Sequence, residues 1–148
     1  MHLRLIDGAG TAGFGDDLAI AGLLQLKPGM VAAEIGTGTA FVARTMASQV
    51  APNGRVIAAA LDREMAAYVA ERAKSEGIQN LSTLVVKADG AGLEPASLDA
   101  VAIVSAFGDF TARPEMLRSI AAALKPGGAL VSQELDGWDP GRAGAAAD

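Results

Sequence analysis

Five short apolar segments alternate with segments of helical period along this chain, and that alternation restricts the fold more than any other feature. The apolar segments are near-continuous, as is typical of parallel strands that are covered on both faces. Strands that alternate with helices predict an α/β fold with a mainly parallel sheet of about five strands. The predicted strands span residues 30–35, 55–60, 82–86, 98–105 and 129–135.

Three of the intervening segments have clear helix signals. Within residues 40–49 and just beyond, Val42, Met46 and Val50 recur at helical spacing. The helix expected after residue 62 ends at Gly77, and the one over residues 113–124 has a proline in its first turn and the stop signal KPGG. A length of 148 residues fits one domain. We expect a flexible N-terminal segment over residues 1–15, the domain over 16–137 and a tail over 138–148.

Composition excludes several classes of function. The chain has no cysteine, and its single histidine, His2, lies at a terminus, so neither a thiolate metal site nor a histidine-dependent triad is expected. A formal net charge of −5 argues against a nucleic-acid partner. No apolar run has the length of a membrane span, and the first residues lack the order of a signal peptide. We therefore expect a cytoplasmic protein without a membrane or nucleic-acid partner.

Ligands of open parallel sheets bind beyond the carboxyl ends of the strands, so the residues after each strand are the candidate site. The first strand is followed by EIGTGTAF, in which Gly36 and Gly38 allow the backbone to turn tightly and approach a ligand. A Gly-x-Gly turn alone fits a structural strand-helix turn equally well. GAGTAG, over residues 8–13, spells a dinucleotide fingerprint, but Asp16 and Asp17 interrupt the helix that such a fold needs.

The order of LKPGMVAAEIGTGTAF, PNGRVIAA, REM, LDAVAIVSAF and MLRSIAAALKPGGALV resembles class I S-adenosylmethionine-dependent methyltransferases over residues 26–137. The resemblance implies a Rossmann-like three-layer sandwich with strand order 3-2-1-4-5. The family usually has seven strands, and we expect a fold without the sixth and seventh. The resemblance also implies S-adenosylmethionine as the cofactor, with its methionine part over the loop Glu34, Gly36, Thr37 and Gly38.

Two departures from the family pattern fall on the cofactor site. Ala40 replaces the third small residue of the loop, which is tolerable if it already lies in the helix. Ala60 stands where the family has an acidic residue that hydrogen-bonds both ribose hydroxyls, so weak cofactor binding is expected. Asp62 either substitutes for that carboxylate or caps the following helix. Asp89 either meets the adenine amino group, as the resemblance implies, or forms an Asp-Gly turn.

The fourth strand end provides the candidate catalytic residues Ser105 and Asp109, where the resemblance implies groups that face the methyl group and substrate. Asp109 either orients the acceptor or caps the helix that follows. The predicted activity is methyl transfer to a small molecule. Alignment of the acceptor can supply much of the acceleration of this reaction. One alternative is a repurposed hydrolase that uses an acidic rim, with or without a divalent metal; another is a non-catalytic relative. The rim would contain Glu34, Asp62, Asp89, Asp109, Glu134 and Asp136. Gln133 and Trp138 add polarity to the same rim, unless this end of the fifth strand is an ordinary solvated edge.

The fifth predicted strand, residues 129–135, has no proline or lysine to discourage pairing with another chain. Because we expect the strands that normally lie beside it to be missing, we also expect it to be an open edge. The sequence therefore predicts a homodimer whose interface includes this edge and residues 136–140, with Trp138 as an anchor. The alternative is a monomer whose tail folds back over the edge.

Overall fold

The computed structural model describes residues 4–7, 20, 22–37, 40–87, 90–104 and 110–133. Its strands are β1 (Arg4–Asp7), β2 (Val31–Ile35), β3 (Arg55–Ala60), β4 (Leu81–Val85), β5 (Leu98–Val104) and β6 (Leu124–Gln133). The helices are α2 (Phe41–Val50), α3 (Arg63–Ser75) and α4 (Arg113–Ala123).

These strands form one parallel sheet in the order β1-β6-β5-β2-β3-β4. From β4 to β6 this is the order 3-2-1-4-5, so the predicted Rossmann-like fold is confirmed. The largest difference in bounds is at β6, which begins at Leu124 rather than at residue 129. The KPGG turn therefore belongs to the strand, whose pairing with β5 has an irregular register between Leu98 and Ala100.

Strand β1 corrects two predictions. It pairs with β6 over four residues, from Arg4 opposite Ala129 to Asp7 opposite Ser132. The segment predicted to be flexible thus contains a strand, and the strand predicted to be an open edge has a partner within the chain. Residues 4–7 have the short apolar pattern of a strand, but the glycine-rich stretch after them suggested a mobile terminus. The homodimer stays a prediction, without this open edge as its basis.

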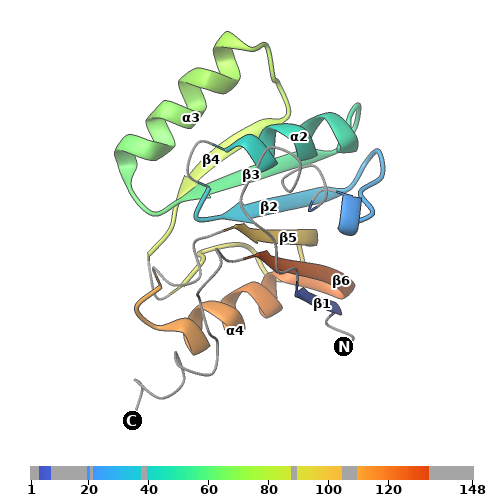
Figure 1. Ribbon diagram of the computed structural model, residues 1–148, viewed down its shortest axis with the longest axis vertical. Helices are drawn as coiled ribbons and strands as arrows, with labels where there is room; N and C mark the ends of the chain where they lie inside the picture. The colour runs from blue at the N-terminus through green and yellow to red at the C-terminus, as the bar shows by residue number, and fades with distance from the viewer. Residues whose placement is uncertain are drawn as a thin grey trace.

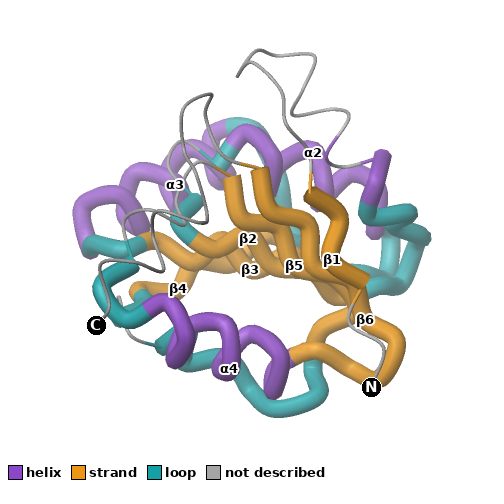
Figure 2. The backbone as a smooth tube through the Cα atoms, turned by 60° about the horizontal axis from the view of Figure 1, so that its bottom comes forward, coloured by secondary structure: helices purple, strands orange, loops and turns teal. Residues whose placement is uncertain are grey.

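The sheet lies between two helical layers, as the two views show (Figure 1, Figure 2). Helices α2 and α3 lie on one face, where Val42, Met46 and Val69 pack in one buried cluster with Val56 of β3. Helix α4 lies on the opposite face, where Met116 and Ile120 pack in a second buried cluster. Nearly half of the buried residues in the first cluster are alanine, which fits helices packed closely on that face of the sheet.

Candidate functional site

The loop after β2 is fixed to the neighbouring strand by its own backbone. The carbonyl oxygen of Ala59 accepts hydrogen bonds from the N–H groups of Gly36 and Thr37, at 2.8 and 3.2 Å. Gly36 has a φ of 73°, in the left-handed region that glycine adopts without steric cost. The N–H of Ala40 then bonds to the carbonyl of Thr37 at 2.7 Å and closes the turn before α2. The predicted binding loop is therefore a tight turn at the carboxyl edge of β2 and β3.

Glu34 is buried beneath this loop and has a structural role. Its side chain is 3% exposed, and Oε2 accepts a hydrogen bond from the N–H of Ala43 at 2.6 Å. Ala43 lies in the first turn of α2, where backbone N–H groups have no partner within the helix. The neighbours of Glu34 on the adjacent strands are Ala58 and Ala102, whose small side chains leave room for the carboxylate. Glu34 thus caps α2 from the strand that precedes it.

Ala40 does not lie in the helix. From the sequence, its methyl group is expected to be tolerated only if it does. It is the N-cap of α2, with φ 59° and ψ 31°, and it makes no side-chain capping bond. A residue with a Cβ costs about 1–2 kcal/mol in this left-handed conformation. Its methyl group is fully buried in the α2 cluster, which offsets part of that cost.

The end of β3 lacks a carboxylate directed at the loop. Ala60 is fully buried, and its carbonyl accepts a hydrogen bond from the N–H of Val86 at 2.9 Å. Asp62 is the N-cap of α3, and its Oδ1 accepts from the N–H of Met65 at 2.7 Å. Of its two predicted roles, the structure therefore confirms the cap; the ribose role stays a prediction.

The other predicted site residues lie outside the described part of the chain. These are Gly38, Asp89, Ser105 and Asp109, together with the fingerprint over residues 8–13. Glu34 and Asp62 are the members of the acidic rim that the structure describes, and both are engaged in capping. Among the described residues, no group of three or more potential metal ligands occurs. Within the described part of the chain, the geometry gives no support to the hydrolase alternative.

Two buried polar atoms lie at the carboxyl edge, one on the predicted cofactor residue Thr37 and one on Gln133. Thr37 Oγ1 and Gln133 Oε1 are each buried without a hydrogen-bond partner. Gln133 is the last residue of β6 and is 6% exposed. From the sequence alone, a glutamine at the end of an apolar strand is expected to face solvent. A buried polar group without a partner costs about 1–3 kcal/mol, so each such group calls for an explanation, and a ligand contact is one explanation at a candidate site.

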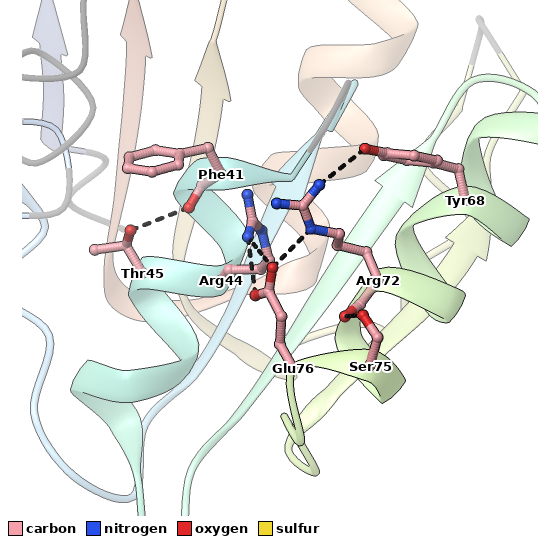
Figure 3. Close-up of polar contacts among 7 residues, drawn as sticks. All are labelled: Phe41, Arg44, Thr45, Tyr68, Arg72, Ser75 and Glu76. Atoms are coloured by element: carbon pink, nitrogen blue, oxygen red, sulfur yellow. Dashed lines mark hydrogen bonds and ion pairs between the residues drawn. The ribbon is translucent and has the colours of Figure 1, made fainter.

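A charged cluster joins α2 to α3 beside the sheet (Figure 3). Arg44 donates two hydrogen bonds to the Glu76 carboxylate, at 2.7 and 2.9 Å, while Arg72 Nε donates a third at 2.7 Å. The bonds from Arg72 and then Arg44 lower the pKa of the Glu76 carboxyl below its ordinary value. Arg44 also lies over the Phe41 ring, 5.7 Å from its centre. The cluster fixes the first turn of α2 relative to the end of α3.

No helix within the described residues is both long and apolar enough to cross a bilayer.

Comparisons with known proteins agree with this geometry. A family model described as a methyltransferase domain matches residues 32–128. The ubiquinone/menaquinone biosynthesis C-methyltransferase of Hydrogenovibrio crunogenus is 28% identical over 76% of this chain and 45% of that protein. The protein-L-isoaspartate O-methyltransferase of Methanopyrus kandleri is 29% identical over 74% of this chain and 46% of that protein. The chain thus spans less than half the length of these relatives.

Solved structures give the same result. The Haemonchus contortus phosphoethanolamine N-methyltransferase 2 in complex with S-adenosyl-L-methionine has a TM-score of 0.72 and 28% identity, over 82% of this chain and 28% of that one. A SAM-dependent methyltransferase from Aquifex aeolicus has a TM-score of 0.70 and 23% identity, over 75% of this chain and 59% of that one, and supports the fold. The family model covers more than half of the chain, including the loop after β2. The chain therefore belongs to the class I S-adenosylmethionine-dependent methyltransferase family.

Proposed function

We propose that this chain binds S-adenosylmethionine at the loop after β2 and transfers the methyl group to a small-molecule acceptor. The observation that carries the proposal is the fixed turn at Gly36 and Thr37, both bonded to the Ala59 carbonyl. Its buried Thr37 hydroxyl has no partner within the protein. A rigid turn with an unsatisfied hydroxyl, at the carboxyl edge of a parallel sheet, fits the polar end of the cofactor.

The residues of the chain would act by positioning. The cofactor supplies an electrophilic methyl group on a sulfonium, and displacement at that carbon needs alignment of the acceptor more than proton transfer. Glu34 holds the start of α2, and the Ala59 carbonyl holds the loop, so the binding surface is preorganised. The single histidine of the chain, His2, is not needed for such a mechanism.

We further propose that cofactor binding is weak, with a Kd of tens to hundreds of micromolar. The residues fit the methionine part of the cofactor better than the ribose, because β3 ends in the buried Ala60. The nearby carboxylate of Asp62 already accepts from the Met65 N–H. Loss of a charge-assisted hydrogen bond costs about 1.5–3 kcal/mol, and each 1.4 kcal/mol is about tenfold in affinity.

A thermal-shift titration with S-adenosylhomocysteine tests the proposal. At 1 mM ligand, a Kd of 100 µM stabilises the native state by about 1.4 kcal/mol, which raises the unfolding midpoint by roughly 4–6 °C. Adenosine alone and magnesium chloride are the controls, and neither should produce this shift. A shift with magnesium but none with S-adenosylhomocysteine would contradict the proposal and favour the hydrolase alternative.

Turnover is then measured as S-adenosylhomocysteine release from S-adenosylmethionine with a panel of small phenols and amines. Release that depends on one of these acceptors supports methyl transfer. Cofactor binding without release over the panel would favour a non-catalytic relative.

A further inference from the structure

Gln133 lies in the same row of the sheet as the binding loop. Within the parallel register, Ile35 is opposite Ile103, Ile103 is opposite Ser132, and Val104 is opposite Gln133. One residue beyond Ile35 is Gly36, so Gly36, Val104 and Gln133 occupy one level across three adjacent strands. Two strand spacings, about 10 Å, therefore separate the loop backbone from Gln133.

The side chain of Gln133 projects from the sheet face that carries α2. Alternate residues of a strand share a face, and Ala129 and Val131 of β6 both pack in the cluster under α2. Figure 2 shows β6, β5 and β2 side by side beneath that layer. The amide thus lies at the carboxyl edge, on the face where β2 leads into the binding loop.

Gln133 lowers the stability of the folded chain at this position unless a ligand bonds to its amide. The residue is 6% exposed, and Oε1 has no hydrogen-bond partner. A methionine has a similar length and no polar group to satisfy. Stability alone would therefore favour an apolar side chain here, and a retained unsatisfied group is typical of functional sites.

We propose that Gln133 binds the methyl acceptor, and that the acceptor is an alcohol, phenol or amine whose O–H or N–H donates to Oε1. This inference rests on the proposed function, since the loop after β2 would hold the cofactor. The carbonyl oxygen of the amide has no hydrogen-bond partner in the free protein, and about 10 Å between Gln133 and the loop backbone is within the span of a small acceptor placed beside the cofactor's methyl group. Gln133 is thus an acceptor-binding residue that determines specificity.

The test compares matched pairs of probes by saturation-transfer NMR in the presence of S-adenosylhomocysteine. The pairs are phenol with anisole, and aniline with N,N-dimethylaniline, which differ in the hydrogen-bond donor. We expect the donor member of at least one pair to give a signal at least threefold stronger with the unmodified chain. That ratio should fall to about one in Gln133→Met and persist in Gln133→Glu, which keeps an acceptor oxygen.

Gln49→Met is the matched control, because Gln49 Oε1 is also buried without a partner but lies on α2. It should leave the donor preference unchanged. Gln133→Met should raise the unfolding midpoint of the free chain by about 2–12 °C, since it removes an unsatisfied group. A lower midpoint for Gln133→Met would show that the amide has a partner in the free protein and would overturn the inference.

A ratio near one in the unmodified chain for both pairs, or a ratio unchanged by Gln133→Met, would also overturn it. The proposed function fails separately, if S-adenosylhomocysteine does not bind. In that case the pairs are measured without it, and the effect of Gln133→Met on their ratio decides the inference alone.

Discussion

The carboxylate of Glu34 accepts a hydrogen bond from the backbone N–H of Ala43 at 2.6 Å, so the strand before the binding loop caps the helix after it. The N-cap residue itself, Ala40, provides no capping side chain. One buried carboxylate therefore takes over the role that serine, threonine or aspartate usually has at a helix start. The loop between Glu34 and Ala43 is held at both of its ends.

Glu34→Leu should lower the free energy of unfolding by about 1–3 kcal/mol, because the Ala43 N–H is left buried without its acceptor. Glu34→Gln should lose less, since the amide oxygen still accepts a hydrogen bond. Urea unfolding measures both. An unfolding free energy for Glu34→Leu equal to that of the unmodified chain would show that the cap contributes nothing.

Gly36→Ala should weaken S-adenosylhomocysteine binding at least tenfold and lower stability by about 1–2 kcal/mol, because φ is 73° at Gly36. Gly77→Ala is the matched control. Gly77 has a φ of 70° after α3, and a Cβ there meets nothing within 4 Å. The two variants should have similar unfolding midpoints in urea, while calorimetry should find an affinity loss in Gly36→Ala alone. Equal affinities in the two variants would separate the loop from the cofactor site.

Asp62→Asn should change neither stability nor S-adenosylhomocysteine affinity measurably, because asparagine caps a helix as well as aspartate does. Asp62→Ala should cost about 1 kcal/mol through loss of the bond from the Met65 N–H. Affinity is measured by calorimetry and stability by urea unfolding. A loss of affinity of tenfold or more in Asp62→Asn, with stability unchanged, would instead assign Asp62 to the ribose.

The cluster between α2 and α3 predicts a specific pH dependence. The pKa of the Glu76 carboxyl is lower in the folded chain than in the unfolded one, mainly because Arg72 and Arg44 donate to it. Its stabilising contribution is therefore present above the ordinary pKa of this carboxyl, 4.5, and is lost as the pH falls through the lower pKa of the folded chain. Glu76→Gln should be less stable than the unmodified chain at pH 7, and the difference should shrink by pH 3.

Urea midpoints at pH 7, 5 and 3 measure this effect, with Glu115→Gln as control. Glu115 forms an exposed pair with Arg118 at 3.7 Å on a single helix, and such pairs contribute little. Its replacement should leave the pH profile unchanged. A difference between Glu76→Gln and the unmodified chain that is the same at pH 3 and pH 7 would contradict the assignment.

The pattern of apolar residues was sufficient to predict the strands from β2 to β6 and the helices between them. Each apolar segment is long enough for its spacing to distinguish a strand from a helix. Strand β1 was not predicted because Leu5 and Ile6 lie in too short a run, and its pairing with β6 depends on residues more than a hundred positions away. Tertiary pairing of this kind leaves no local signal in the sequence.

The site was predicted in part. The position of the loop and the capping alternative for Asp62 followed from residue types and spacing. The burial of Glu34 could not be predicted, because a carboxylate at a strand end is usually exposed and only the packing of α2 buries this one. The sequence also could not show that the Gln133 amide is buried without a partner, since both are properties of the packed structure.

Isothermal titration calorimetry of S-adenosylhomocysteine tests the central claim most directly, with the unmodified chain, Ala60→Asp and Ala60→Asn compared. Ala60 is fully buried, so Ala60→Asp should also reduce stability in the free state, and urea unfolding must show that each variant is folded. We predict a Kd of tens to hundreds of micromolar for the unmodified chain. Ala60→Asp should bind about tenfold tighter or more, because the carboxylate restores charge-assisted bonds to the ribose, and Ala60→Asn should gain less. Absence of binding to the folded chain at millimolar ligand, nanomolar binding without any substitution, or no gain in Ala60→Asp would contradict the account.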